Sequence, residues 1–334
     1  MSLLSVLSNK AIKHSNIISL LFLIVLIFLA SIRYRTGSDY LSYVSIWNDI
    51  TPFYDGETGR EYLEPGFRYF VSILKMFTSE TSIFFFSMAF LTLAVLYSGL
   101  KKIEYLNIYV AISLYFMIFY MPYTFNAMRQ AVAMSIFIYS LIYIINNDFK
   151  KVLFLSLLAA SFHLTGLLIL ISYFISRVKI KLINYFLIGM IVSFLVYYLN
   201  ILGMAIDLFF GAKFSAFSDS WGSTSIFQFL IRFIIVLFFV FISIKVIKTK
   251  FFEKTVIIYL LGFFIYIALA DANMMAVRFN MFFRVLEVVL FSMVLYQSQY
   301  ITNRVLFFIF TFALAISTFY LNISNEDNIY QTIF

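Results

Sequence analysis

Most arginines of this chain lie near one end of its apolar segments, and most lysines lie near the other end. The positive-inside rule assigns the lysine-bearing side to the cytoplasm. The same rule disfavours arginine on the outer side, so recognition of a planar or phosphate-bearing anion is a natural reason for its presence there. The outer arginines are Arg33, Arg35, Arg60, Arg68, Arg129, Arg232, Arg278 and Arg284.

Arg129 is a candidate anion-binding residue because of its place in the chain. It lies near the outer start of an apolar run over 126–145, where a helix offers free N–H groups and the positive end of its dipole. A cation there is unfavourable unless an anion arrives. The alternative is an arginine that extends toward lipid headgroups.

Arg278 and Arg284 flank the outer start of a later apolar run. They are six residues apart, or about 240° around a regular helix, so their side chains do not point the same way. Arg284 has an alternative role in an ion pair with Glu287 at spacing i,i+3. Arg232 has only Gln228 one turn before it, which favours a structural role.

Three side chains are candidates for a general base. His163 is one, because an imidazole, with an unperturbed pKa of about 6.5, exchanges protons near neutral pH. Asp39 and Glu64, from the acidic stretch after the first apolar run, compete for the role. The alternative for His163 is a buried, hydrogen-bonded histidine without a catalytic role.

The composition places these residues in a membrane protein. The chain of 334 residues is 63% hydrophobic and 12% charged, about half the charge of a soluble domain. The net charge of +8 comes mostly from lysines beside apolar segments, which argues against nucleic acid as a partner. With no cysteine and two histidines that lie far apart, no metal site is expected.

The long continuous apolar runs predict an all-α polytopic membrane protein, since a helix satisfies its own backbone hydrogen bonds in lipid. We expect a single membrane domain over 1–334 with a cytoplasmic N-terminus, an uncleaved first span, and outer loops at 33–81 and 201–224. A helix over 67–77, too short to cross, should lie along the outer interface. Nine crossings are expected, at 15–32, 82–100, 107–121, 126–145, 182–200, 225–247, 255–270, 280–296 and 305–321.

The segment 152–176 does not fit a single crossing, because lysines precede it and basic residues follow it. Both ends are therefore expected on the cytoplasmic side. A re-entrant helical hairpin that turns within the membrane near Ser161–Gly166, with His163 at its apex, satisfies this. Non-helical backbone at that depth implies a polar cavity. The alternative is one tilted helix with a reversed loop.

Several short motifs stand in order along most of the chain. They are Arg35-Thr36-Gly37-Ser38-Asp39-Tyr40, Glu64-Pro65-Gly66-Phe67, Phe125-Asn126-Ala127-Met128-Arg129-Gln130-Ala131-Val132-Ala133, Ser161-Phe162-His163 and Arg278-Phe279. Together these motifs resemble the EpsG family, which belongs with the Wzy-type polymerases of bacterial exopolysaccharide and O-antigen. Where the family often has a tyrosine–phenylalanine pair, this chain reads Asn280-Met281-Phe282-Phe283.

The resemblance implies an enzyme that joins oligosaccharide repeat units carried on undecaprenyl diphosphate, at the outer face of the bacterial cytoplasmic membrane. It also implies a fold similar to the all-helical (GT-C-like) membrane glycosyltransferases, with no cofactor or metal, and allows a flippase and a chain-length regulator as partners. The implied base is His163, with Asp39 and Glu64 in reserve. The diphosphate-binding residues would be Arg129, Arg278, Arg35, Arg284 and Gln130.

Two other functions remain open. A membrane O-acyltransferase that modifies a polysaccharide also uses many spans, a histidine and arginines, but its acyl donor comes from the cytoplasmic side. A lipid-linked oligosaccharide flippase should show repeated halves around a charged cavity. No such repeat is visible in the sequence.

Overall fold

The chain is helical almost throughout the part that the computed structural model describes. It divides into two compact units: Met1–Ile171 with Phe291–Phe334, and Ser172–Leu290. Helices α8 (Leu168–Ile175) and α15 (Leu286–Gln297) cross the boundary between them. The described residues are 3–56, 58–201, 204, 225–297 and 304–333.

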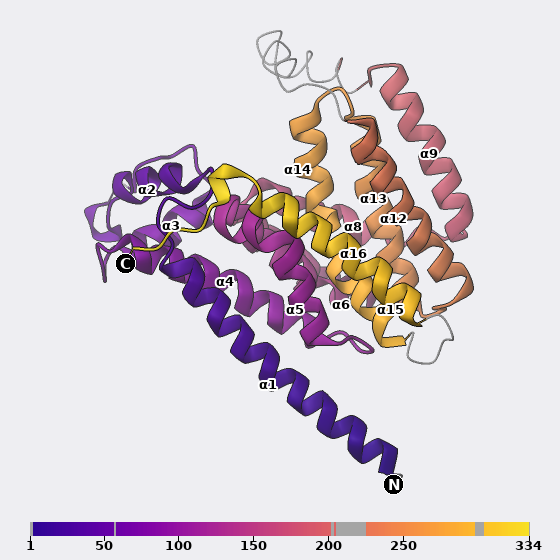
Figure 1. The fold of residues 1–334 in the computed structure, drawn as a ribbon. Helices are drawn as coiled ribbons and strands as arrows, with labels where there is room; N and C mark the ends of the chain where they lie inside the picture. The colour runs from indigo at the N-terminus through magenta and orange to yellow at the C-terminus, as the bar shows by residue number, and fades with distance from the viewer. Residues whose placement is uncertain (1–2, 57, 202–203, 205–224, 298–303, 334) are drawn as a thin grey trace. The chain divides into compact units, whose positions relative to one another are not determined.

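The first unit contains the segment 33–81 and the helices that follow it (Figure 1). Helix α6 packs against α4 and against α7, and α1 packs against both α4 and α5. The elements are α1 (Leu3–Ser31), α2 (Tyr40–Asp49), η1 (Phe53–Asp55), α3 (Pro65–Leu74), α4 (Thr81–Leu100), α5 (Ile108–Tyr115), η2 (Phe116–Asn126), α6 (Met128–Ile145), α7 (Phe149–Phe162), η3 (Leu164–Leu167), α16 (Arg304–Ile323) and η5 (Glu326–Asn328).

Helix α6 has the largest buried share of the apolar helices, with 78% of its span buried. Its small residues Ala131, Val132 and Ala133 are almost fully enclosed. A helix with this share buried has packing partners for most of its side chains. The Arg129 at its start is therefore carried on the best-supported helix of the unit.

The segment before α6 is a π-helix rather than a continuous α-helix. η2 contains Pro122, and the N–H of Ala127 donates to the carbonyl of Pro122 at 3.2 Å, a bond that spans five residues. Proline removes one backbone donor, and wider π-turns often occur at functional positions. The apolar runs predict one span that ends at 121 and another that begins at 126, and they give no sign of this geometry.

Helix α7 ends at the point where the sequence predicts a turn. His163 has an extended backbone (φ −159°, ψ 130°), and η3 follows it. The hydroxyl of Ser156 donates to the carbonyl of Gly166 at 3.1 Å, so η3 folds back onto α7. The helix is broken as expected, while its re-entry from the cytoplasmic side stays a prediction.

The C-terminal segment returns to the end of α1. Arg33 and Thr332 form an isolated antiparallel bridge, and the N–H of Tyr34 donates to the carbonyl of Gln331 at 2.9 Å. The hydroxyl of Tyr330 donates to the carbonyl of Leu29 at 2.8 Å. These bonds hold residues 330–332 beside the start of the segment 33–81.

The second unit is built around α13. This helix packs against α9, α12 and α14. The elements are α9 (Leu182–Tyr198), α12 (Ile226–Lys245), α13 (Lys250–Ala268) and α14 (Asn273–Arg284).

Seven helical stretches in the described residues are long and apolar enough to cross a membrane, which is consistent with a polytopic membrane protein. Nine crossings were expected. The run at 15–32 falls in the apolar part of α1, Ile17–Ser31, and the run at 182–200 corresponds to the shorter apolar helix Leu182–Tyr198. The latter has 17 residues and extends about 26 Å, slightly less than a core of about 30 Å. The expected outer loop at 201–224 lies almost wholly outside the described residues.

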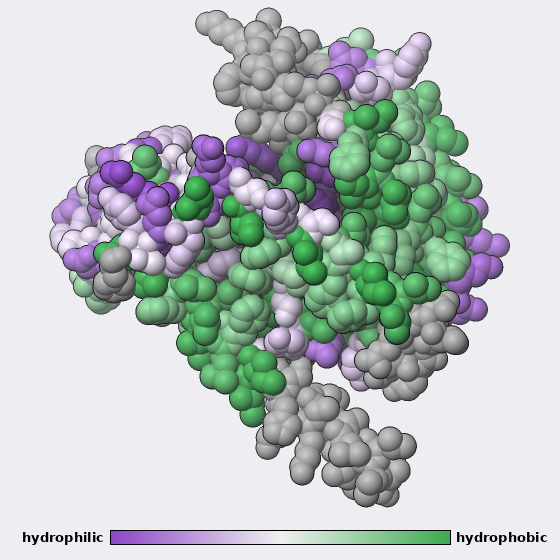
Figure 2. Space-filling model, in the orientation of Figure 1, coloured by the Kyte–Doolittle hydropathy of each residue, from purple (hydrophilic) through white to green (hydrophobic). Residues whose placement is uncertain are grey.

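The surface of the first unit has two characters (Figure 2). Hydrophobic residues cover α4, α5 and the described face of α1, whereas hydrophilic residues gather over α2 and α3. Exposed side chains such as Phe28, Phe86 and Phe90 belong to the hydrophobic part. A helical bundle in lipid with a polar end in water has this distribution.

Candidate active site

A carboxylate and a guanidinium from distant parts of the chain meet at the polar end of the first unit. Glu64 precedes α3, and Arg129 is the second residue of α6. Nη1 of Arg129 donates to Oε2 of Glu64, and the two side chains are 26% and 20% exposed. The pair is therefore half-buried and still reachable from solvent.

The same carboxylate also reaches the turn after α7. The N–H of Leu164 donates to Oε1 of Glu64 at 3.4 Å. Glu64 therefore links the segment before α3, the start of α6 and the residue that follows His163. Glu64, Arg129 and the turn at His163, which the sequence predicts in the site, are brought together in this way.

The Glu64-Pro65-Gly66 motif has a packing reason. Pro65 occupies the first turn of α3, where its fixed φ and missing N–H cost nothing. A Cβ added at Gly66 would lie 2.2 Å from Oγ of Ser161 and 2.9 Å from its carbonyl oxygen. Only glycine allows α3 to approach α7 this closely, and this approach places Glu64 beside the turn.

His163 caps η3 with its side chain. The N–H of Thr165 donates to Nδ1 of His163 at 3.3 Å, and Oγ1 of Thr165 lies 2.8 Å from the same nitrogen. The residue is half-buried. Its ring is thus oriented by its own turn.

The Arg35–Tyr40 motif is bonded to the residue pair before α6 through Asn126. The backbone N–H of Asp39 donates to Oδ1 of Asn126 at 3.4 Å. Gly37 has φ +98°, and a Cβ there would lie 2.2 Å from the same oxygen. Asp39 is the residue directly before α2, and its side chain makes no capping hydrogen bond to that helix.

Two further expected residues differ in exposure. Arg35 is exposed, with its guanidinium carbon 5.3 Å from the Tyr34 ring centroid. Gln130 is only 3% exposed, although it adjoins Arg129.

Tyr43 of α2 also contacts the site. Its hydroxyl accepts a hydrogen bond from the backbone N–H of Arg129 at 3.5 Å. Burial raises the pKa of the Tyr43 phenol.

Arg33, which the sequence predicts among the outer arginines, is buried in the structure. It is 1% exposed, and its guanidinium carbon lies 4.3 Å from the Phe85 ring centroid and 4.6 Å from that of Phe125. Nη2 of Arg33 contacts the sulfur of Met128 at 3.3 Å, while Nε and Nη1 have no hydrogen-bond partner among the described residues. Burial lowers its pKa to about 10, so it stays charged at neutral pH.

In the second unit, Arg284 is engaged by a buried carboxylate. Its Nε and Nη2 donate to the two oxygens of Glu287 at 2.7 and 3.0 Å, and Tyr259 donates to the same carboxylate at 2.9 Å. This is the ion pair that the i,i+3 spacing offers. Arg278, on the same helix, is exposed.

Arg232 is buried in the same unit. Its guanidinium carbon lies 3.8 Å from the ring centroid of Tyr266, and the residue is 8% exposed. This packing agrees with the structural role that its sequence context favours.

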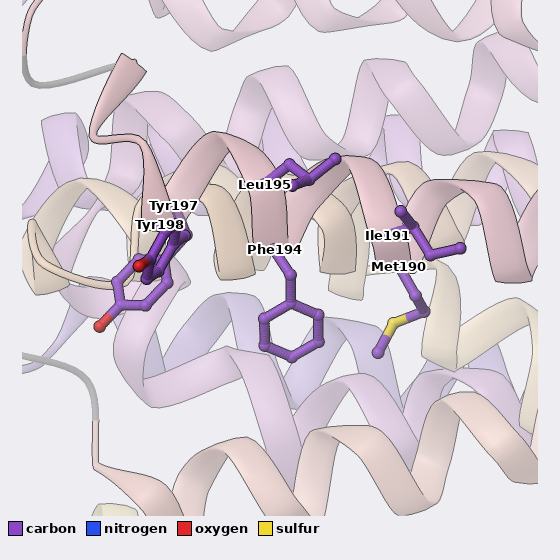
Figure 3. A pocket seen from close by; sticks show the side chains of 6 residues that line it. All are labelled: Met190, Ile191, Phe194, Leu195, Tyr197 and Tyr198. Atoms are coloured by element: carbon purple, nitrogen blue, oxygen red, sulfur yellow. The ribbon is translucent and has the colours of Figure 1, made fainter.

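Figure 3 shows a pocket on one face of α9. It is lined by Met190, Ile191, Phe194, Leu195, Tyr197 and Tyr198. Its lining offers no carboxylate, imidazole or cation, so it lacks the groups needed for acid–base or phosphate chemistry. Within the described residues, no cluster of three or more histidine, aspartate or glutamate side chains could hold a metal ion.

Apolar helices long enough to span a bilayer, with an arginine–carboxylate pair and a histidine turn at one polar end, define a polytopic membrane protein. The chain belongs to the EpsG family, whose model matches residues 16–334. EpsG is a family of Wzy-type polysaccharide polymerases, so the resemblance read from the motifs is confirmed. No curated protein and no solved structure matches the chain.

Proposed function

We propose that this protein joins oligosaccharide repeat units carried on undecaprenyl diphosphate into a bacterial polysaccharide. We further propose that it acts at the outer face of the cytoplasmic membrane. Membership of the EpsG family supports a polymerase of the glycosyltransferase type in general. The lysine-rich segments support an N-terminus in the cytoplasm and a polar end of α2 and α3 outside.

The observation that carries the proposal is the contact of Glu64 with both Arg129 and the turn at His163. Arg129 stands in the first turn of α6, where the helix dipole disfavours a cation unless an anion accompanies it. Glu64 supplies that anion in the structure described here. A substrate phosphate would compete for the same guanidinium, so the pair is an anion-binding position held ready by an internal carboxylate.

The reaction forms one bond and breaks one. The oxygen of an acceptor sugar hydroxyl attacks the anomeric carbon of the growing glycan, and the bond from that carbon to the diphosphate oxygen breaks. The electron pair stays with the diphosphate, and the hydroxyl proton passes to a base. His163, Glu64 and Asp39 are the proposed candidates for this base.

Positive charge near the leaving diphosphate lowers the barrier, because charge develops there only toward the transition state. We assign this role to Arg129, with Arg35 and Gln130 as further contacts within the first unit. Arg278 belongs to the second unit and stays a candidate from the sequence alone. Arg284 is committed to Glu287, so we leave it out of the diphosphate site.

The test uses the purified protein in vesicles with a defined lipid-linked repeat unit. A ladder of polymers supports the proposal. A unit that crosses the bilayer without extension would instead indicate a flippase, and transfer of an acyl group to the sugar would indicate an acyltransferase.

Arg129→Lys tests the diphosphate contact in the same assay. Lysine keeps the charge and loses the planar fork, so we expect turnover to fall at least about tenfold, or about 1.4 kcal/mol of barrier. The matched control is Arg60→Lys, because Arg60 also pairs with a carboxylate, that of Asp49, away from the site. Equal activity in both variants would contradict a bidentate role for Arg129.

A further inference from the structure

The hydrogen bonds around His163 fix where its proton lies. The backbone N–H of Thr165 points to Nδ1 of His163 at 3.3 Å. An amide N–H only donates, so the nitrogen that receives it carries no proton. A neutral imidazole carries one proton, and in this geometry that proton is on Nε2.

The hydroxyl of Thr165 reinforces this arrangement. Its Oγ1 lies 2.8 Å from the same nitrogen, and an unprotonated Nδ1 makes the hydroxyl the donor. Both donors come from a residue two positions ahead, in a turn whose Thr165 is buried. The basic nitrogen of His163 is therefore occupied within its own turn, while Nε2 bears the N–H.

We propose that Thr165 is a positioning residue that makes His163 a hydrogen-bond donor through Nε2, and that Glu64 rather than His163 receives the acceptor proton. This inference rests on the proposed polymerase function. It assigns opposite roles to two of the candidate bases, and it gives Thr165 a role that follows from its contacts alone.

The proton balance of the step is simple. The acceptor hydroxyl gives its proton to the carboxylate of Glu64 as its oxygen bonds to the anomeric carbon. Nε2–H of His163 donates a hydrogen bond to the phosphate oxygen that leaves, and keeps its proton. Such a donor stabilises charge that develops only as the bond breaks.

The position of Glu64 beside the turn at His163 makes its carboxylate the base that acts together with the Nε2–H donor. Oε1 of Glu64 accepts from the N–H of Leu164, the residue next to His163. Carboxylate and imidazole are thus held by one turn. When a substrate phosphate draws the guanidinium of Arg129, the Oε2 lone pairs that Arg129 occupies become available to a proton.

A direct test reads the tautomer without any activity. The chain has two histidines, His14 and His163, so His14→Gln leaves one. Nitrogen-15 NMR of histidine-labelled protein in lipid distinguishes a protonated ring nitrogen from a bare one. We expect His163 to show a bare Nδ1 and a protonated Nε2, and a protonated Nδ1 would overturn the inference.

A second test compares His163→Gln with His163→Ala. The amide nitrogen of glutamine reaches about as far as Nε2 and donates, but it accepts no proton at neutral pH. We expect His163→Ala to lose about 10²- to 10³-fold in turnover, the usual effect of a lost transition-state donor, and His163→Gln to recover at least about tenfold of that. Equal losses in both variants would return the base role to His163.

Thr165 is tested by Thr165→Val and Thr165→Ser. Serine keeps the donating hydroxyl and valine keeps the shape without it, so turnover should fall further in Thr165→Val. Only the backbone N–H then holds the tautomer, so the share of protonated Nδ1 in the NMR spectrum should be larger in Thr165→Val than in Thr165→Ser. Equal turnover and equal spectra in the two variants would remove the hydroxyl from the argument. A wild-type protein that makes no polymer would overturn the proposed function itself, whereas the tautomer can be measured whichever reaction the protein catalyses.

Discussion

Gly66→Ala should inactivate the protein through a displacement of Glu64. An added Cβ would lie 2.2 Å from Oγ, 2.7 Å from Cβ and 2.9 Å from the carbonyl oxygen of Ser161. Comfortable contacts between such atoms are about 3.5–4.0 Å. The start of α3 must therefore move away from α7 by on the order of 1 Å, since two of the three contacts are with atoms that a rotamer change does not move.

The magnitude follows from two effects. Overpacking of this kind costs about 1–3 kcal/mol in stability. A misplacement of about 1 Å in a reacting group costs about 10²-fold in rate. Glu64 stands two residues before Gly66 and holds both Arg129 and Leu164, so we expect turnover to fall about a hundredfold.

The assay measures polymer formation and thermal unfolding of the same purified sample in detergent. Ser161→Gly removes two of the three close atoms, so Gly66→Ala combined with Ser161→Gly should recover part of the activity relative to Ser161→Gly alone. The matched control is Gly56→Ala. Gly56 has φ +84° and nothing within 4 Å of an added Cβ, so it should lose about 1–2 kcal/mol of stability and little turnover.

Full activity in Gly66→Ala would refute the reasoning, because the close approach of α3 and α7 would then not position Glu64. The same conclusion would follow if Gly56→Ala lost as much turnover as Gly66→Ala. In that case general instability, and not the displaced carboxylate, would account for both.

Two further predictions concern stability, measured by thermal unfolding. Phe85→Leu removes the ring 4.3 Å from the buried guanidinium of Arg33 and should cost about 2 kcal/mol more in the wild type than in an Arg33→Met background; equal costs would exclude the cation–π contact. The hydrogen bond from Arg60 holds the pKa of Asp49 below its usual range, so its stabilising effect is complete above about pH 3.9 and is lost as the pH falls through the lower folded value. Asp49→Asn should therefore be less stable than wild type at pH 7 and equal to it in strong acid, and a difference that grows in acid would reverse the sign.

The residues of the candidate site could be found from the sequence because their signals are local. Charge segregation marks a polar end, short motifs carry the resemblance to EpsG, and a helix break at His163 follows from basic residues at both ends of one apolar run. Each of these signals is read along the chain itself, from one apolar run and its flanks or from one short motif, so no tertiary contact is needed to detect it.

The partners of those residues could not be found in the same way. Glu64 and Arg129 are 65 residues apart, and nothing in the periodicity around either one selects the other. Their contact depends on how closely α3 approaches α7, which a glycine at Gly66 permits and packing completes. Arg33 and the two rings beside its guanidinium, Phe85 and Phe125, likewise come from three separate segments of the chain.

By itself, the sequence determined that this is a helical membrane protein of the EpsG family, and which residue types it offers for chemistry. Only the tertiary structure decided that Glu64 pairs with Arg129, that Arg284 is engaged by Glu287, and which nitrogen of His163 accepts a hydrogen bond. The physical reason is the range of the interactions. Hydrophobicity and charge act through the local run of residues, whereas hydrogen bonds and ion pairs require atoms to meet within about 3 Å, and only the packed chain sets those distances.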